Sequence, residues 1–381
     1  WDVSCVTSDA LLSRTRTSQS IAVLAYQNED EKRYGLLYHP ELSESKDDER
    51  FLKRFLVDVA EVSRTWDLQS YIDDTVARLK HVIGDKKALC AFSGGIDSVV
   101  ASLLVHRAIG QNLTCIFVDT GLMRHNEVAE VEKVFSDSYQ MNLKIVDAED
   151  RFLTKLKGVT DPEEKRKIIG TEFIRVFEEE AKALGHVDYL VQGTIYPDVI
   201  ESGFAGQAKV KSHHNVGGLP EDIGFTGIIE PLRDLFKLEV RRIGSYLGLP
   251  DRIVWRQPFP GPGLAVRCLG ELTKERLDIL RKADAIFREE VYNAGLHRDI
   301  QQYFAVLSNV YSVGVRNNAR TYEETCVLRA VKTIDFMTAN WVHLPYELLD
   351  RTAERIIAEV PGINRVAYDI TSKPPATIEW E

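Results

Sequence analysis

The chain has 381 residues, with 48 Lys and Arg against 58 Asp and Glu, so its formal net charge is -10. This balance provides no polybasic surface and argues against nucleic acid as the main ligand. Helix ends and a few lysines still allow small anionic substrates. The length exceeds the size at which single hydrophobic cores stop growing, which predicts two domains and part of a third.

Targeting signals and disulfides are not evident in the sequence. No segment has the features of a signal peptide, and no apolar run approaches the roughly 20 residues that a membrane span needs. The five cysteines are scattered without a CxxC pair or a disulfide framework, which predicts a reducing, cytoplasmic location: Cys5, Cys90, Cys115, Cys268 and Cys326. Since the chain starts at Trp1 rather than Met, we expect further sequence upstream.

Residues 1–65 contain too little chain for an independent domain. Their second half holds the stretch DDERFLKRFLVDVAEV (47–62), in which Phe51, Phe55 and Val59 recur at helical spacing. We therefore predict a helix there, within the remnant of a domain.

Residues 66–256 alternate between short β-rich runs and longer amphipathic segments. The runs are ALCAF (88–92), TCIFVD (114–119), LKIVDA (143–148) and YLVQG (189–193). This alternation predicts an α/β fold with a doubly wound parallel sheet, and with ligands at the carboxyl ends of its strands.

The stretch PFPGPG (258–263) changes the pattern and indicates a linker or an ordered turn. A helix is expected over residues 271–295, followed by short strands such as RVAYDI (365–370). Residues 257–381 are therefore predicted to form a smaller α+β domain.

The sequence SGGIDS (93–98) joins the first of these strands to a helix, which places backbone N–H groups and a helix N-terminus against an anion. Gly94 and Gly95 permit close approach, and Ser93 and Ser98 add hydroxyl groups. A Walker loop would carry a lysine, whereas this loop carries Asp97, whose carboxylate would repel polyphosphate unless a hard cation lies between them. We therefore interpret Asp97 as a Mg²⁺ ligand. The alternative is a simple helix cap at a βα turn.

The pattern SGGxDS resembles the loop of the ATP pyrophosphatases, and six further stretches together resemble the GMP synthase family. They are FVDTGLMR (117–124), DPEEKRKIIG (161–170), VQGTIYPDVIES (191–202), KSHHNVGGLP (211–220), PFPGPGLAVR (258–267) and KPPATIEWE (373–381). The resemblance implies that ATP adenylylates the C2 oxygen of XMP, that pyrophosphate leaves, and that ammonia displaces AMP to give GMP. It also implies Mg²⁺ and a homodimer formed through the C-terminal domain.

The resemblance also implies roles for individual residues. The ATP site would comprise Ser93, Gly94, Gly95, Ile96, Asp97, Ser98, Asp119, Gly193, Asp198 and Glu201, with Asp97 and Lys211 as catalytic residues. XMP would be bound by Arg267, Arg320, Lys373, Thr377 and Glu379, with Glu379 or Glu381 accepting from a purine N–H. The structural alternatives are strand-end carboxylates that cap turns, a surface loop around Lys211, and a tail that closes a dimer interface.

The segment LLYHPEL (36–42) resembles the end of a class I glutamine amidotransferase, in which His39 would be the base and Glu41 its orienting carboxylate. The only cysteine before His39 is Cys5, which has no flanking glycine of a nucleophile elbow. We therefore expect this chain to use ammonia rather than glutamine.

Three positions depart from the family pattern. Leu238 stands where the family has Asp, Gln257 where it has His before PFPGPG, and Asn317–Asn318 where it has Gly-Asp before Arg320.

Two alternative functions fit the sequence less well. NAD synthetase or a tRNA-modifying enzyme would lack the C-terminal block or carry basic or Cys-rich additions, and a non-enzymatic homologue would need altered loop residues.

Overall fold

The computed structural model describes residues 14–17, 20–23, 25–28, 30–37, 40, 46–63, 65–201, 224–333 and 336–381. The chain divides into two compact units, residues 1–66 and 67–381. In the first unit, β1 (Arg14–Thr17) pairs with β2 (Ser20–Val23) and β3 (Ala25–Asn28) with β4 (Arg33–Leu36), both antiparallel. The predicted helix is present as α1 (Lys46–Arg54), which continues as a π-helical turn over Phe55–Val59.

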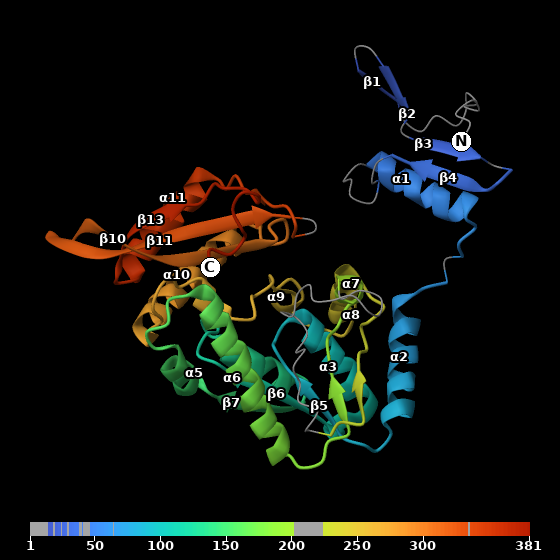
Figure 1. Ribbon diagram of the computed structural model, residues 1–381, viewed down its shortest axis with the longest axis horizontal. Coiled ribbons are helices and arrows are strands. Elements are labelled where there is room, and N and C mark those ends of the chain that lie inside the picture. The colour runs from blue at the N-terminus through green and yellow to red at the C-terminus, as the bar shows by residue number, and fades with distance from the viewer. Residues whose placement is uncertain are drawn as a thin grey trace. The chain divides into compact units, whose positions relative to one another are not determined.

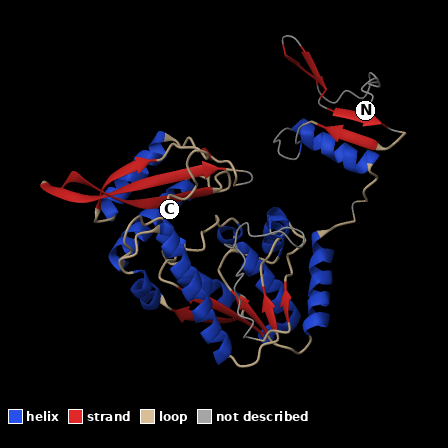
Figure 2. Ribbon diagram, in the orientation of Figure 1, coloured by secondary structure: helices blue, strands red, loops and turns tan. Residues whose placement is uncertain are grey.

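The second unit contains a five-stranded sheet in the order β7-β6-β5-β8-β9, in which every neighbouring pair is parallel (Figures 1 and 2). Its strands are β5 (Ala88–Ala91), β6 (Leu113–Asp119), β7 (Asn142–Asp147), β8 (Tyr189–Val191) and β9 (Gly227–Ile229). The predicted α/β, doubly wound sheet is confirmed. The order reverses between β5 and β8, so the loops that follow these strands lie at the switch point where such sheets bind ligands.

Helices cover both faces of this sheet. One apolar cluster unites α2 (Leu68–Ile83), α3 (Ile96–Ile109) and α8 (Lys237–Tyr246) with Cys90 and Phe117. A second cluster packs α5 (Glu149–Leu156) and α6 (Pro162–Ala183) against Leu89 and Ile116. Neighbouring residues of one strand thus face opposite clusters, as the two-residue repeat of a strand requires. The remaining helices of this region are α4 (Glu127–Glu132), α7 (Tyr196–Glu201) and α9 (Asp251–Val254).

The stretch PFPGPG is an ordered turn that leads into a 3-10 helix at Gly263–Val266. Gly263 has a φ of +63°, and a Cβ at this position would overlap the carbonyl oxygen of Leu122. The N–H of Leu264 donates to that same oxygen at 2.8 Å. Glycine is therefore required here both by the backbone angle and by the close approach of the loop after β6.

The C-terminal part consists of α10 (Lys274–Asn293), the long hairpin β10 (Gln302–Arg316) and β11 (Ala319–Lys332), then β12 (Asn340–Trp341), α11 (Tyr346–Glu359) and β13 (Ile363–Tyr368). The strand β13 pairs parallel with β11 (Figure 1), and β12 pairs antiparallel with β11. The hairpin turn is made by Asn317 and Asn318, with φ values of 50° and 60°. Asparagine tolerates this left-handed region well, so the departure from Gly-Asp preserves the two-residue turn.

The sheet and the C-terminal part share one apolar core. The cluster that holds Phe152 and Phe177 also contains Leu277 and Phe287 of α10 and Leu307 of β10. Within the described residues, no helix is long and apolar enough to cross a membrane.

Candidate active site

The loop SGGIDS connects β5 to α3 at the switch point of the sheet. Gly94 has a φ of +72°, and Gly95 is the N-cap residue of α3. The first N–H groups of a helix have no partner inside the helix, so those of residues 96–98 form the anion-binding end of α3. The structure thus supplies the strand, glycine turn and helix that an anion site needs.

The two serines of this loop hold its shape. Ser98 Oγ donates to the carbonyl oxygen of Gly95 at 3.0 Å, and Ser93 Oγ lies 3.0 Å from Ser98 Oγ. Ser93 Oγ also accepts from the Gly95 N–H at 3.3 Å. These contacts fix the backbone of the loop and leave the N–H groups of residues 96–98 to face an anion.

The Asp97 side chain is held by a cation from another helix. Its Oδ2 accepts from the ammonium of Lys237, the first residue of α8, while Oδ1 is buried and has no hydrogen-bond partner among the described residues. Arg241 lies one turn further along α8. Burial lowers the pKa of its guanidinium group, and the negative charge of Asp97 acts in the opposite direction. A Mg²⁺ ion is commonly held by one or two carboxylates together with substrate phosphates, so the unpaired Oδ1 fits such a ligand. Among the described residues, no group of three or more His, Cys, Asp or Glu forms a protein-only metal site.

The loop after β8 packs directly on the start of α3. A Cβ on Gly193 would lie 2.9 Å from the carbonyl carbon of Asp97 and 2.9 Å from the Ser98 nitrogen. In α7, the next element, Asp198 Oδ2 accepts from the Ile195 N–H at 3.0 Å. Asp198 therefore stabilises the turn that leads into α7.

Asp119 ends β6, and its Oδ1 accepts from the Gly121 N–H at 2.9 Å. Burial raises the pKa of the Asp119 carboxyl group, and the carboxylates of Asp147 and Glu149 act in the same direction. The positive charge of Arg281 of α10 counteracts this rise in pKa, and Arg281 donates to the carbonyl oxygens of Gly121 and of Met123. The loop after Asp119 is thus held by the C-terminal part of the chain.

Sequence reasoning missed the residues that connect these loops. Arg256 donates to the carbonyl oxygen of Gly94 at 3.1 Å and pairs with Glu127 Oε1 at 2.7 Å. The other oxygen of Glu127 accepts from the backbone N–H of Arg124 at 3.0 Å. Arg124 stacks on Phe259, with its guanidinium 4.1 Å from the ring centroid. Its Nε and Nη1 are buried and have no hydrogen-bond partner in the part of the chain that the structure describes. Arg124 lies in the quoted FVDTGLMR stretch, but residue type alone does not distinguish it from a surface arginine.

The predicted XMP residues of the tail are close together but engage one another. Arg267 is fully buried and binds Glu379 through two hydrogen bonds of 3.0 and 2.8 Å. Thr377 Oγ1 donates to the carbonyl oxygen of Glu379, and the half-buried Lys373 donates to the carbonyl oxygen of Phe336 at 2.7 Å. Among the described residues, Nη1 of Arg267 has no hydrogen-bond partner.

Arg320 lies elsewhere, exposed near the turn of the β10–β11 hairpin and opposite Val315. Gln257, in place of the family's histidine, is buried and accepts from the N–H of Tyr303 at 2.8 Å, which secures the start of β10. Leu238 is exposed on α8, and nothing in the structure explains this departure.

Some predicted residues lie outside the described part of the chain. They are His39, Glu41 and Lys211, together with the side chain of Glu201. Their roles stay predictions.

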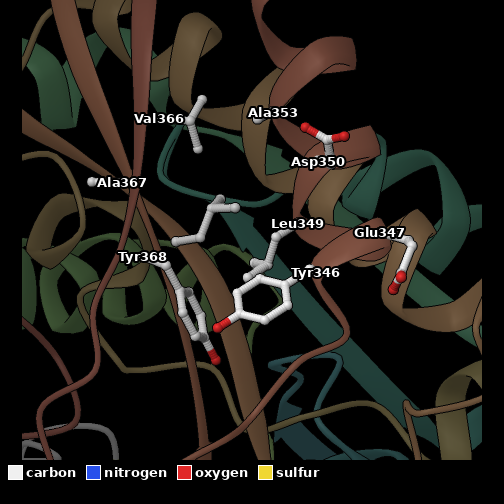
Figure 3. A pocket seen from close by; sticks show the side chains of 9 residues that line it. Tyr346, Glu347, Leu349, Asp350, Ala353, Val366, Ala367 and Tyr368 are labelled. Carbon is white, nitrogen blue, oxygen red and sulfur yellow. The ribbon is translucent and has the colours of Figure 1, made fainter.

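A cavity of ≈ 510 Å³ lies between α11 and β13 (Figure 3). Its lining includes Tyr346, Leu349 and Tyr368, and its charged residues are Glu347 and Asp350. Two carboxylates and no cation make this cavity unsuitable for a nucleotide phosphate, and it contains none of the predicted site residues.

Comparisons with known proteins agree with this arrangement. Residues 289–380 match the GMP synthase C terminal domain, and residues 87–194 match the Phosphoadenosine phosphosulfate reductase domain. "GMP synthase [glutamine-hydrolyzing]" of Clostridium tetani is 59% identical over 94% of this chain and 70% of its own length. The protein of that name from Acetivibrio thermocellus is 60% identical over the same shares. The chain belongs to the GMP synthase family. Among solved structures, the NMN synthetase from Francisella tularensis matches 57% of this chain and 87% of its own, with 16% identity and a TM-score of 0.40.

Proposed function

We propose that this GMP synthase family member aminates XMP to GMP through an adenylyl-XMP intermediate, with release of AMP and pyrophosphate. The observation that carries the proposal is the SGGIDS loop at the sheet's switch point, where α3 begins beside Lys237 of α8 and Arg256, which follows α9. Family membership makes the enzyme a carbon–nitrogen ligase. Adenylylation breaks the bond between the α and β phosphates, and the β and γ phosphates leave as pyrophosphate.

The residues of the loop bind and orient the phosphates. The N–H groups at the start of α3 face the anion, and Lys237 and Arg241 provide positive charge where pyrophosphate develops its negative charge. Asp97 Oδ1 would hold Mg²⁺, which when bound neutralises phosphate charge. Lys211 would assist in the same way from the segment 211–220.

XMP is proposed to bind at the tail, where Lys373, Thr377 and Glu379 would contact the nucleotide and Arg267 would orient Glu379. Arg320 remains a proposed XMP contact from the hairpin. Ammonia attacks C2 of the adenylylated XMP, and AMP leaves. The glutamine hydrolysis named for the relatives is a property of those proteins, so ammonium is the nitrogen source for the test.

We also propose a homodimer formed through the C-terminal part, in the cytoplasm. The hairpin presents Tyr311, Val313, Val315 and Tyr322 on one face, and Val315 is 76% and Tyr322 69% exposed. An exposed apolar face on a long hairpin is typical of an interaction surface. Val313→Glu should convert the dimer to a monomer in sedimentation, and a native chain that is already monomeric would contradict the proposal.

The test of the reaction is a product analysis. Turnover with XMP, ATP, Mg²⁺ and ammonium should release AMP, pyrophosphate and GMP in equal amounts. Formation of ADP and orthophosphate as primary products would contradict the cleavage position. AMP release without GMP would instead indicate a different acceptor from XMP.

A further inference from the structure

Three fully buried cations converge on the last residues of the chain. Lys165 comes from α6, Arg267 from the turn after PFPGPG, and Arg329 from β11, and each is 0% exposed. A buried cation is strongly unfavourable unless it is paired and hydrogen-bonded. All three obtain hydrogen-bond or ion-pair partners from residues 377–381. The tail must therefore keep this position for the three cations to keep their partners.

Arg329 and Arg267 hold the tail from the C-terminal part itself. Arg329 donates from Nε to the Ile378 carbonyl oxygen and from Nη2 to that of Thr377, both at 2.8 Å. Its Nη1 pairs with Asp369 at 2.7 Å. Arg267 forms the two bonds to Glu379. These contacts fix the backbone on either side of the predicted nucleotide contacts.

Lys165 differs because it reaches the tail from the helical layer of the ATP-binding sheet. Its ammonium donates to the carbonyl oxygens of Ala265 at 3.3 Å and Cys268 at 3.1 Å, and to Glu381 Oε2 at 2.5 Å. An ammonium group has three N–H donors, so these acceptors use all of them. Lys165 therefore has no donor left for a substrate and acts only through the segments it joins.

Glu381 completes this connection. Its side chain is 9% exposed, and its second oxygen accepts from the Gly270 N–H at 3.1 Å. Both oxygens of Glu381 are bonded within the protein and its side chain is 9% exposed, so Glu381 is an anchor, whereas the Glu379 side chain is 20% exposed and Thr377 is exposed. The single buried ion pair between Lys165 and Glu381 thus joins α6, the 263–270 turn and the tail.

We propose that Lys165 is a positioning residue for XMP: its ion pair with Glu381 sets the tail in the conformation that receives the nucleotide. This inference rests on the proposed binding of XMP by the tail. Preorganised contacts increase affinity because the ordering of the binding segment is complete before the ligand arrives. Loss of the pair should therefore weaken XMP binding while the ATP loop, built from other contacts, is unaffected.

The main variant is Lys165→Met, which retains much of the chain length but removes the charge. In the ammonium-dependent assay, KM for XMP should rise at least about tenfold, while KM for ATP stays within about twofold and kcat at saturating XMP changes little. Arg276→Met is the matched control, because it breaks another buried ion pair, with Glu324 at 2.6 Å, between α10 and β11. Within the described residues, Arg276 donates to Glu324 and to Glu271 rather than to the tail.

Both variants leave a glutamate without its ion-pair partner, so they differ in whether that glutamate belongs to the tail. The inference would be overturned if KM for XMP rose no more in Lys165→Met than in Arg276→Met. If Lys165→Met does not fold, Glu381→Gln replaces it, because this change keeps the Gly270 bond and removes only the charge. An unchanged KM for XMP in Glu381→Gln would equally overturn the inference. Lys373→Met distinguishes a failure of this inference from a failure of the proposed XMP site. A normal KM for XMP in that variant would contradict XMP binding by the tail itself.

Discussion

The loop at residues 93–98 and the tail at residues 373–381 are held in place by different kinds of contact. In the loop, bonds between Ser93, Gly95 and Ser98 span at most five residues of sequence. In the tail, the Lys165–Glu381 bond spans 216 residues and the Arg267–Glu379 bond 112. The loop builds itself from its own motif, whereas the tail depends on the completed fold.

The difference extends to how charge is treated. Asp97 and Lys237 are both partly exposed, so their charges remain accessible to phosphate and to a metal ion. The cations beneath the tail are fully buried and are neutralised by carboxylates and carbonyl oxygens of the protein. We conclude that the loop provides charge for chemistry, while the charges beneath the tail provide position.

The largest expected effect comes from Asp97→Asn. This change keeps the side-chain size but removes the negative charge whose free oxygen fits Mg²⁺, so turnover should fall at least about a hundredfold. Calorimetry should show normal XMP affinity and sedimentation an unchanged mass, because the tail and hairpin are not altered. Near-normal turnover of Asp97→Asn would contradict the assignment of chemistry to the loop.

Lys373→Met should affect the tail alone. It removes a charged donor and should weaken XMP binding by ~1.5 to 3 kcal/mol, the value of a charge-assisted hydrogen bond. KM for ATP should not change. A variant that lost ATP and XMP binding together would show that the two regions are not separable in this way.

The sequence allowed much of the fold to be predicted. The runs at 88–92, 114–119, 143–148 and 189–193 correspond to β5 to β8. Strands buried on both faces form short continuous apolar segments, as in β5, β6 and β8, whereas β7 at the edge of the sheet is only partly buried. The three-residue strand β9 was missed, as was the long hairpin of β10 and β11. In β10, residues 302–308 are buried and the following residues are mostly exposed, so no single repeat pattern runs through the strand.

For the site, local motifs identified the loop but not its partners. Lys237 pairs with Asp97 across 140 residues of sequence, and a lysine on a helix face cannot be distinguished by residue type from a solvated one. Arg256, Glu127 and Arg329 lie outside the motifs, and Lys165 lies within DPEEKRKIIG without a role that its residue type would reveal. The importance of all four arises from contacts between distant segments. The individual XMP and ATP contacts stay predictions.

Gly193→Ala should disturb the loop through packing alone. The new methyl group would lie 2.9 Å from backbone atoms of Asp97 and Ser98, so the start of α3 must shift, at a cost of about 1 to 3 kcal/mol in stability and with a higher KM for ATP. Gly170→Ala is the matched control, since it lies in α6 with nothing within 4 Å of the added Cβ. That control should raise stability by about 0.5 to 1 kcal/mol and leave both KM values unchanged. Equal effects of the two variants in thermal unfolding would show that the contact at Gly193 is unimportant.

The smallest effect is expected in the stability of Asp119→Asn. Burial raises the pKa of Asp119 in the folded chain, so the folded state loses stability relative to the unfolded state as pH rises from the ordinary carboxyl pKa of 3.8 through the raised value. Asparagine cannot ionise and can still accept the Gly121 N–H, so the variant should unfold at a slightly higher temperature than the native chain at neutral pH. The two melting temperatures should converge as pH falls below that ordinary value.

Asp147→Asn is the control variant. It lies at the exposed end of β7 and removes the same charge without relieving a buried carboxylate, so it should raise the melting temperature less. If Asp119 lies beside the nucleotide as proposed, its variant should combine higher stability with a higher KM for ATP, because the unfavourable buried charge is then retained for function. A gain in stability with unchanged ATP kinetics would assign Asp119 to the turn after β6 alone.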